Sequence, residues 1–162
     1  MNIKRMLIVC TGNSCRSVMA QGLMQQAFTR AGLDAIQVES AGVFAMEGMS
    51  PTRETQRVLL EAGIDCSHHR ARSVTLEMIE SAGLLLVMEE FQAEEITRRA
   101  PSARSKVHLL KTFGLAQPVE SGRAGIPDPI GKPLEVYEVC FAEIREAVER
   151  VVRSLGVASG GP

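Results

Sequence analysis

The chain has 162 residues, 45% of them hydrophobic, and a formal net charge of −1 at pH 7, which fits one domain that buries about 70% of its unfolded surface. A net charge of −1 is not typical of nucleic-acid-binding proteins, which are strongly basic, so we do not expect nucleic acid as a partner. No apolar run is long enough to approach a membrane span, so we do not expect a membrane as a partner. Four cysteines without a close Cys-x-x-Cys pair resemble reduced thiols, and the N-terminus lacks a signal-peptide core, so we expect a cytoplasmic protein.

Apolar runs of strand type alternate with helical patterns along the chain. Strands are expected at 3–10, 36–40, 84–88 and 107–110, and helices at 18–31, 51–62, 76–81, 90–99 and 133–155. Ser50 followed by Pro51 predicts a helix cap and a first-turn proline, and Pro133 marks the start of the last helix in the same way. The alternation predicts an α/β fold, with a four-stranded, doubly wound parallel sheet and helices on both faces. Residues 1–156 would form this single domain, and 157–162 a flexible tail.

A thiol and an arginine flank the loop between the first strand and the first helix. The segment reads Val9-Cys10-Thr11-Gly12-Asn13-Ser14-Cys15-Arg16-Ser17. Such a loop points its backbone amides at one spot beside a helix N-terminus, where anions bind and the deprotonated thiolate is favoured. We therefore expect Cys10 to be a thiolate at the carboxyl end of a strand, where ligands of open parallel sheets bind.

Other residues of this loop suit an oxyanion site. Gly12 and Asn13 tolerate the left-handed backbone that a tight anion cradle needs. Ser17 can cap the helix and hydrogen-bond the thiolate, and Arg16 offers a planar fork for two phosphate oxygens. The alternative is a buried structural cysteine beside a solvated arginine.

The same Cys-x5-Arg spacing occurs a second time, from Cys66 to Arg72. That segment contains no glycine, follows no apolar strand and opens no clear helix, so we interpret the second match as accidental.

A long segment without periodicity, 116–132, contains Ile126-Pro127-Asp128-Pro129. Loops of this length are usually functional or disordered. Asp128 has two interpretations, a proline-framed turn or a general acid on a mobile loop over the thiolate. The spacing does not establish that Asp128 lies near Cys10, which is 118 positions away.

Together, Cys10 to Ser17 and Asp128-Pro129 resemble the low-molecular-weight protein phosphatases. The resemblance extends to Ser40-Ala41-Gly42-Val43-Phe44-Ala45 and to Ser67-His68-His69-Arg70-Ala71-Arg72. It implies a flavodoxin-like fold with the phosphate loop between the first strand and the first helix. It also implies a polar network that holds this loop, formed by Asn13, Ser17, Ser40 and His69. His69 is then structural, which the residues alone also favour over metal ligation, since no third ligand is evident.

The mechanism that the resemblance implies runs through a phosphocysteine. Cys10 attacks phosphorus, Arg16 and the loop hold the equatorial oxygens, and Asp128 protonates the leaving group and then takes a proton from water. No metal and no cofactor is needed. The residues expected to bind substrate are Thr11, Gly12, Asn13, Ser14, Cys15, Ser17 and Phe44.

Substrate choice stays open between phosphoarginine and phosphotyrosine in proteins. Tyrosine-directed members usually carry a bulky aliphatic residue where this chain has Ser14, and aromatic residues where it has Ile130. Bacterial protein-arginine phosphatases resemble the chain better, including a helix that carries Tyr137, although they have threonine at the position of Ser14 and an aromatic residue at that of Ile130. Phe44 is a candidate wall for either substrate. The sequence slightly favours phosphoarginine.

Two further alternatives concern the cysteines and the class of protein. Related arsenate reductases share this loop but need a cysteine pair in the region 81–91, and none is present. Cys66 and Cys140 are expected to be buried small hydrophobes. Cys15 could form a protective disulfide with Cys10 or simply pack behind the loop.

A non-catalytic oxyanion-binding module would lack the nucleophile, the arginine or the acid, and all three are present.

Overall fold

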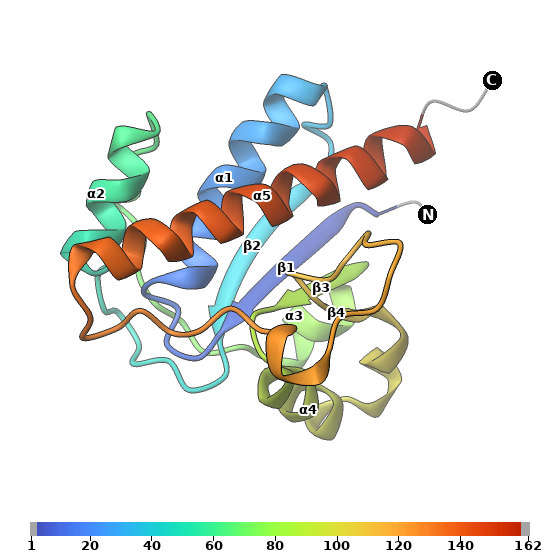
Figure 1. The fold of residues 1–162 in the computed structure, drawn as a ribbon. Coiled ribbons are helices and arrows are strands. Elements are labelled where there is room, and N and C mark those ends of the chain that lie inside the picture. The colour runs from blue at the N-terminus through green and yellow to red at the C-terminus, as the bar shows by residue number, and fades with distance from the viewer. Residues whose placement is uncertain (1–2, 160–162) are drawn as a thin grey trace.

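The protein is an α/β domain with helices on both faces of one parallel sheet (Figure 1). The computed structural model describes residues 3–159. The strands are β1 (Arg5–Cys10), β2 (Gln37–Gly42), β3 (Leu84–Val87) and β4 (Val107–Leu109). They are ordered β2-β1-β3-β4 and all neighbouring pairs are parallel, which confirms the predicted sheet.

Within residues 3–159, five α-helices and two 3-10 helices accompany these strands, and the last two helices follow β4. They are α1 (Arg16–Ala31), α2 (Arg53–Glu61), α3 (Leu76–Ser81), α4 (Glu90–Arg99), η1 (Pro101–Lys106), η2 (Ser121–Arg123) and α5 (Leu134–Ser159). The two 3-10 helices were not predicted, because such short segments carry no 3.6-residue apolar period. Since α5 continues through Ser159, the first residues of the expected tail are helical, and 160–162 lie outside the described residues.

Alternation along β1 explains the two packed layers. Met6 and Ile8 are fully buried in the core formed with α1 and α5, whereas Leu7 and Val9 belong to the core formed with α3 and α4. Successive side chains of a strand point to opposite faces, so an uninterrupted apolar strand must be covered on both sides. Figure 1 shows α1 and α5 on one face of the sheet and α3 and α4 on the other.

Three helix starts differ from the prediction, and that of α5 differs by a single residue. The N-cap of α2 is Thr52, whose hydroxyl accepts a hydrogen bond from the Thr55 amide at 3.3 Å. The expected cap at Ser50 and Pro51 is therefore wrong, because the residue whose hydroxyl reaches the free amide lies further along the chain. Helix α1 begins at Arg16, two residues before the predicted start.

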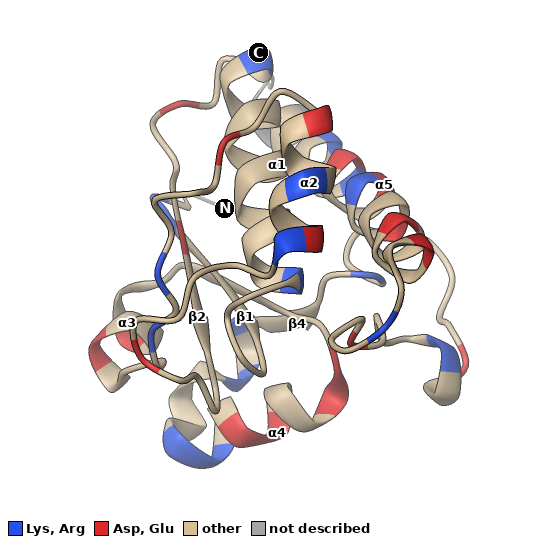
Figure 2. Ribbon diagram, turned by 90° about the vertical axis from the view of Figure 1, so that its left-hand side faces the viewer, with Lys and Arg blue, Asp and Glu red and all other residues tan. Residues whose placement is uncertain are grey.

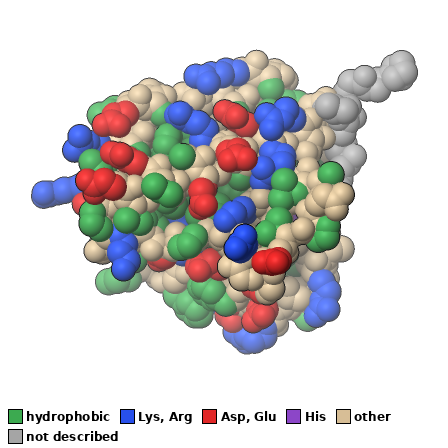
Figure 3. Space-filling view, viewed as in Figure 1, with side chains coloured by type: hydrophobic (Ala, Val, Ile, Leu, Met, Phe, Trp, Pro, Cys, Tyr) green, Lys and Arg blue, Asp and Glu red, His purple; other side chains and the backbone are tan. Residues whose placement is uncertain are grey.

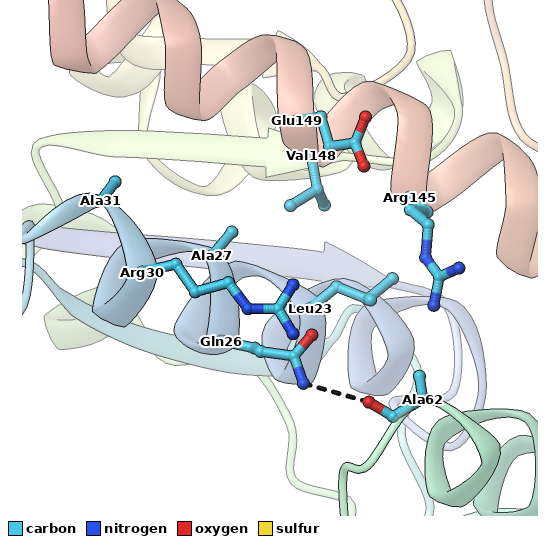
Figure 4. A pocket seen from close by; sticks show the side chains of 9 residues that line it. All are labelled: Leu23, Gln26, Ala27, Arg30, Ala31, Ala62, Arg145, Val148 and Glu149. Carbon is cyan, nitrogen blue, oxygen red and sulfur yellow. Dashed lines mark hydrogen bonds between the residues drawn. The ribbon is translucent and has the colours of Figure 1, made fainter.

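Surface charge and cavities complete the description of the fold. Acidic and basic residues are intermixed along the helices in Figure 2 and over the face drawn in Figure 3. Over the part of the chain that the structure describes, no helix is both long and apolar enough to cross a membrane. A cavity of about 450 Å³ lies between α1 and α5 (Figure 4), lined by the second half of α1 and therefore away from the loop that follows β1.

Candidate active site

The nucleophile candidate and the arginine lie where β1 ends and α1 begins. Cys10 is the last residue of β1, and Arg16 is the first residue of α1. Asn13 adopts a left-handed backbone with φ of 55°, which lets the intervening loop turn tightly, as expected for this position. The loop is thus held at the carboxyl end of the sheet, as predicted.

The sulfur of Cys10 is hydrogen-bonded to its own loop and to the helix that follows. The Asn13 amide donates to Sγ at 3.3 Å, and the Ser17 hydroxyl lies 3.0 Å from Sγ. Ser17 does not cap α1, contrary to the expectation. The N-cap is Cys15, and Ser17 already lies inside the helix because α1 starts earlier than predicted. Its hydroxyl is therefore available to the sulfur rather than to the helix terminus.

Asn13 fixes the orientation of that hydroxyl. Its Nδ2 donates to the Ser17 oxygen at 2.8 Å and to the Ser40 oxygen at 3.0 Å. The Ser17 oxygen accepts from Asn13 and keeps its own proton, which it can donate to the Cys10 sulfur when that sulfur is a thiolate. Ser40 in turn donates to Gln21 Oε1 at 2.6 Å, a partner that sequence reasoning missed.

The rest of the Asn13 side chain and backbone is also engaged. The Arg72 amide donates to Asn13 Oδ1 at 3.1 Å, and His69 Nε2 lies 2.9 Å from the Asn13 carbonyl oxygen. Burial lowers the pKa of His69, although its bond to Asn13 opposes this effect. A neutral His69 that donates to a carbonyl fits the expected structural role. The four residues of the expected network are therefore in contact through Asn13.

Arg16 is almost completely buried and nearly saturated with partners. Its Nη1 donates to Glu89 Oε2 at 2.6 Å and to the Ile126 carbonyl at 2.7 Å. Its Nη2 lies 3.4 Å from both Thr11 Oγ1 and Asp128 Oδ2. Its Nε is buried and has no hydrogen-bond partner among the described residues. A buried donor without an acceptor is costly, which identifies Nε as a group prepared for an anion.

The neighbours of Arg16 favour its protonated, charged form. Burial lowers the pKa of Arg16, but Cys10 and the hydrogen bond with Glu89 outweigh this effect, so the pKa lies above its usual value. Glu89 was not singled out from the sequence. It lies at the N-cap of α4, and only the fold brings that helix next to the loop.

Asp128 lies in the predicted proline-framed turn and also reaches Arg16, while its role as a general acid stays a prediction. Its Oδ1 accepts a hydrogen bond from the Ile130 amide at 3.1 Å, which is a local turn, and its Oδ2 faces Arg16. Two residues earlier, Ile126 is fully buried and its amide donates to the Met88 carbonyl at 2.9 Å. The backbone on which Asp128 is carried is therefore anchored on both Arg16 and the end of β3.

Cys15 is buried behind the loop. Its Sγ lies 3.5 Å from Thr52 Oγ1 and 3.7 Å from the hydroxyl of Tyr137, and burial raises the pKa of Tyr137 to about 12. All four cysteines are free, and Cys66 and Cys140 are buried, as expected. These contacts show the packing role of Cys15, while a disulfide with Cys10 stays a prediction.

The residues expected near the substrate side chain are exposed. Phe44 is 62% exposed and Ile130 is 54% exposed. Met46 and Met49, which follow Phe44 in the chain, are also exposed and were not considered from the sequence. Ser14 is half-buried, and its hydroxyl contacts only the Cys15 sulfur, at 3.8 Å, within the described residues.

The whole chain is similar to known phosphatases. Residues 5–158 match the model of the low molecular weight phosphotyrosine protein phosphatase family. A protein-arginine-phosphatase of Geobacillus stearothermophilus is 37% identical over 151 residues, covering 93% of this chain and 95% of that protein. A probable low molecular weight protein-tyrosine-phosphatase of Ralstonia solanacearum is also 37% identical, over 95% of this chain and 99% of the relative.

Solved structures agree with these sequence matches. The arginine phosphatase YwlE from Geobacillus stearothermophilus superposes with a TM-score of 0.83 at 35% identity, covering 95% of this chain and 94% of that one. A YwlE variant with a phosphorylated active-site serine gives a TM-score of 0.85 at 30% identity, covering 93% of this chain and 95% of that one. This chain therefore belongs to the low molecular weight phosphotyrosine protein phosphatase family.

Proposed function

We propose that this protein hydrolyses phosphorylated side chains of proteins through a phosphocysteine on Cys10. The observation that carries the proposal is the pairing of a sulfur that is hydrogen-bonded to the Asn13 amide and the Ser17 hydroxyl with a buried Arg16 whose Nε has no partner among the described residues. One group can attack phosphorus, and the other can hold its oxygens. The relatives named as arginine or tyrosine phosphatases support this class of reaction.

The chemistry proceeds in two displacements. In the first, the Cys10 thiolate forms a bond to phosphorus, the bond from phosphorus to the leaving oxygen or nitrogen breaks, and Asp128 supplies the proton to the leaving group. In the second, water attacks phosphorus while Asp128 takes its proton, and the phosphorus–sulfur bond breaks to restore the thiolate. Arg16 contributes Nε and Nη2 to the equatorial oxygens in both steps.

Among protein substrates, we propose a slight preference for phosphoarginine over phosphotyrosine. The hydroxyl of Ser14 has little else to bind and can orient a guanidinium or a water beside phosphorus, which an aliphatic side chain could not. Ile130 provides no aromatic wall for a phenol ring. The phosphorylated proteins themselves would meet the enzyme in the cytoplasm, since all four thiols are free.

One set of assays tests the reaction and the preference together. Wild type, Cys10→Ser and Ser14→Ile are compared on p-nitrophenyl phosphate and on matched phosphoarginyl and phosphotyrosyl peptides. Cys10→Ser should lose at least about a thousandfold in turnover, because a serine hydroxyl lacks the thiolate's reactivity. Ser14→Ile should lower the ratio of phosphoarginine to phosphotyrosine turnover.

Cys66→Ser serves as the matched control, because Cys66 is also a buried free thiol but is absent from the loop. It should retain wild-type turnover. Full activity of Cys10→Ser would refute the phosphocysteine, and an unchanged substrate ratio in Ser14→Ile would refute the role given to Ser14.

Arsenate reduction is not favoured. That chemistry needs further cysteines to carry the oxidation away from Cys10, and the expected region 81–91 has none. The relatives reported above are phosphatases, which agrees with this conclusion.

A further inference from the structure

Gln92 is a buried polar residue of α4 that the mechanism leaves unused. Its side chain is fully buried, although a glutamine is usually exposed on a helix surface. Its Oε1 accepts hydrogen bonds from the backbone amides of Met88 and Glu89, at 2.8 and 3.0 Å. Its Nε2 donates to Thr11 Oγ1 at 3.2 Å. The carboxamide thus connects the end of β3 with the loop after β1.

Two of the three hydrogen bonds of Gln92 lead to partners of Arg16. Thr11 Oγ1, which Gln92 holds, is an acceptor for Arg16 Nη2. Glu89, whose amide Gln92 also holds, binds Arg16 Nη1 through its carboxylate. One carboxamide therefore restrains a partner of each terminal nitrogen of the guanidinium.

A planar guanidinium held at both terminal nitrogens has a fixed plane. With Nη1 and Nη2 restrained, Nε can point in only one direction, and Nε is the buried donor without a partner among residues 3–159. Stabilisation of a phosphoryl transition state depends on donors that are aligned before the reaction, so a small rotation of this plane would weaken it. We infer that Gln92 is a positioning residue that sets the plane of Arg16 through Thr11 and Glu89.

The inference rests on the proposed phosphatase function and deepens it. The test uses Gln92→Leu, which keeps approximately the side-chain volume and removes all three hydrogen bonds, and Thr11→Val, which removes only the hydroxyl. We expect each to lower kcat for p-nitrophenyl phosphate about tenfold and to weaken binding of orthovanadate by a similar factor, with a smaller change in KM. Melting temperatures are recorded for every variant.

The double variant tests whether the effect of Gln92 passes through Thr11. If it does, Gln92→Leu together with Thr11→Val should lose less than the product of the two single losses. Gln26→Leu is the matched control, because Gln26 also donates a side-chain hydrogen bond to an oxygen, the Ala62 carbonyl at 3.1 Å, but lies on the second half of α1 (Figure 4). It should retain wild-type kcat and orthovanadate affinity.

Each outcome decides the matter. A lower melting temperature of Gln92→Leu with unchanged kcat and orthovanadate affinity would show a purely structural role and overturn the inference. Losses that multiply in the double variant would overturn the route through Thr11. If Gln92→Leu fails to fold, Thr11→Val decides, and wild-type orthovanadate affinity would again overturn it. Absence of turnover in the wild type would instead refute the proposed function, and orthovanadate binding would still test the positioning.

Discussion

The proposed role of Asp128 as an acid can be tested by substituting it and comparing two leaving groups of different basicity. Its carboxylate lies 3.4 Å from Arg16, and 37% of its side chain is exposed. It can therefore reach both the phosphate-binding loop, residues 10–16, and the leaving group of a substrate. We predict that Asp128→Ala lowers kcat/KM, which reports the first displacement, by about a hundredfold or more for phenyl phosphate, whose leaving group needs a proton, and much less for p-nitrophenyl phosphate. Steady-state assays on the two esters provide the measurement.

The control for this prediction is Glu120→Ala, an exposed acid earlier in the same connection. It should leave both rates unchanged. Equal losses in kcat/KM on the two esters in Asp128→Ala would remove Asp128 from the role of acid, because a proton donor matters more for a more basic leaving group.

Single residues differ in how far the sequence predicts them. Cys10 and Arg16 stand out because a thiol and a guanidinium flank a glycine-containing loop between a strand and a helix. Glu89 and Gln92 lie more than seventy positions away, and a glutamate or glutamine at a helix start usually means only a solvated first turn. Their contact with the loop is set by the packing of α4 against β3 and β4, which no local pattern encodes.

Among the elements, the end of β2 supports the loop after β1. A Cβ at Gly42 would lie 2.5 Å from the Thr11 carbonyl oxygen and 3.1 Å from the Asn13 amide. Gly42 cannot retreat, because its amide donates to the Arg72 carbonyl and its carbonyl accepts from the Val74 amide, both at 2.9 Å. The loop must therefore move if a side chain is added here.

We predict that Gly42→Ala lowers kcat/KM at least about tenfold and destabilises the fold by about 1–3 kcal/mol, since both clashing atoms belong to the backbone. Assays on p-nitrophenyl phosphate and chemical denaturation measure the two effects. Gly122→Ala is the control, because its Cβ would meet nothing within 4 Å. Wild-type activity in Gly42→Ala would show that the loop tolerates displacement.

The elements themselves are largely predictable, whereas their ends are not. Each of the four predicted runs forms a strand. The central strands β1 and β3 are nearly continuous in apolar residues because they are buried on both faces, whereas the edge strand β2 carries Gln37, Glu39 and Ser40 and the edge strand β4 is only half-buried. The start of α2 was misplaced because both Ser50 and Thr52 can cap a helix, and the choice depends on which hydroxyl meets a free amide. Such a choice follows from tertiary geometry.

In the whole molecule, the site is assembled from the carboxyl ends of the strands. Cys10 ends β1, Phe44 follows β2 and Glu89 follows β3, while Asp128 lies in the long connection after β4. Parallel strands place these connections at one edge of the sheet, which is why residues far apart in sequence meet. The fold class predicts that edge, but only the resemblance to a family assigned Asp128 to it.

The stability of the whole molecule should depend on pH through His69. Burial lowers the pKa of His69 in the folded protein, while an unfolded histidine keeps a pKa of about 6.5. As the pH falls through this value, the unfolded chain takes up a proton that the folded protein resists, so the free energy of unfolding decreases. We predict a steady loss of stability between about pH 7.5 and 5.5, measured by urea denaturation.

Substitution of the histidine identifies the source of this dependence. His69→Gln should lower stability at pH 7.5, because the bond to the Asn13 carbonyl is weakened, but it should flatten the change with pH. His68→Gln, at the exposed neighbouring position, should keep the wild-type pH dependence. Acids whose pKa is depressed in the fold, such as Glu95 with a pKa of about 2, titrate below this window and do not contribute. A pH dependence in His69→Gln as steep as that of the wild type would therefore assign the proton uptake to another group.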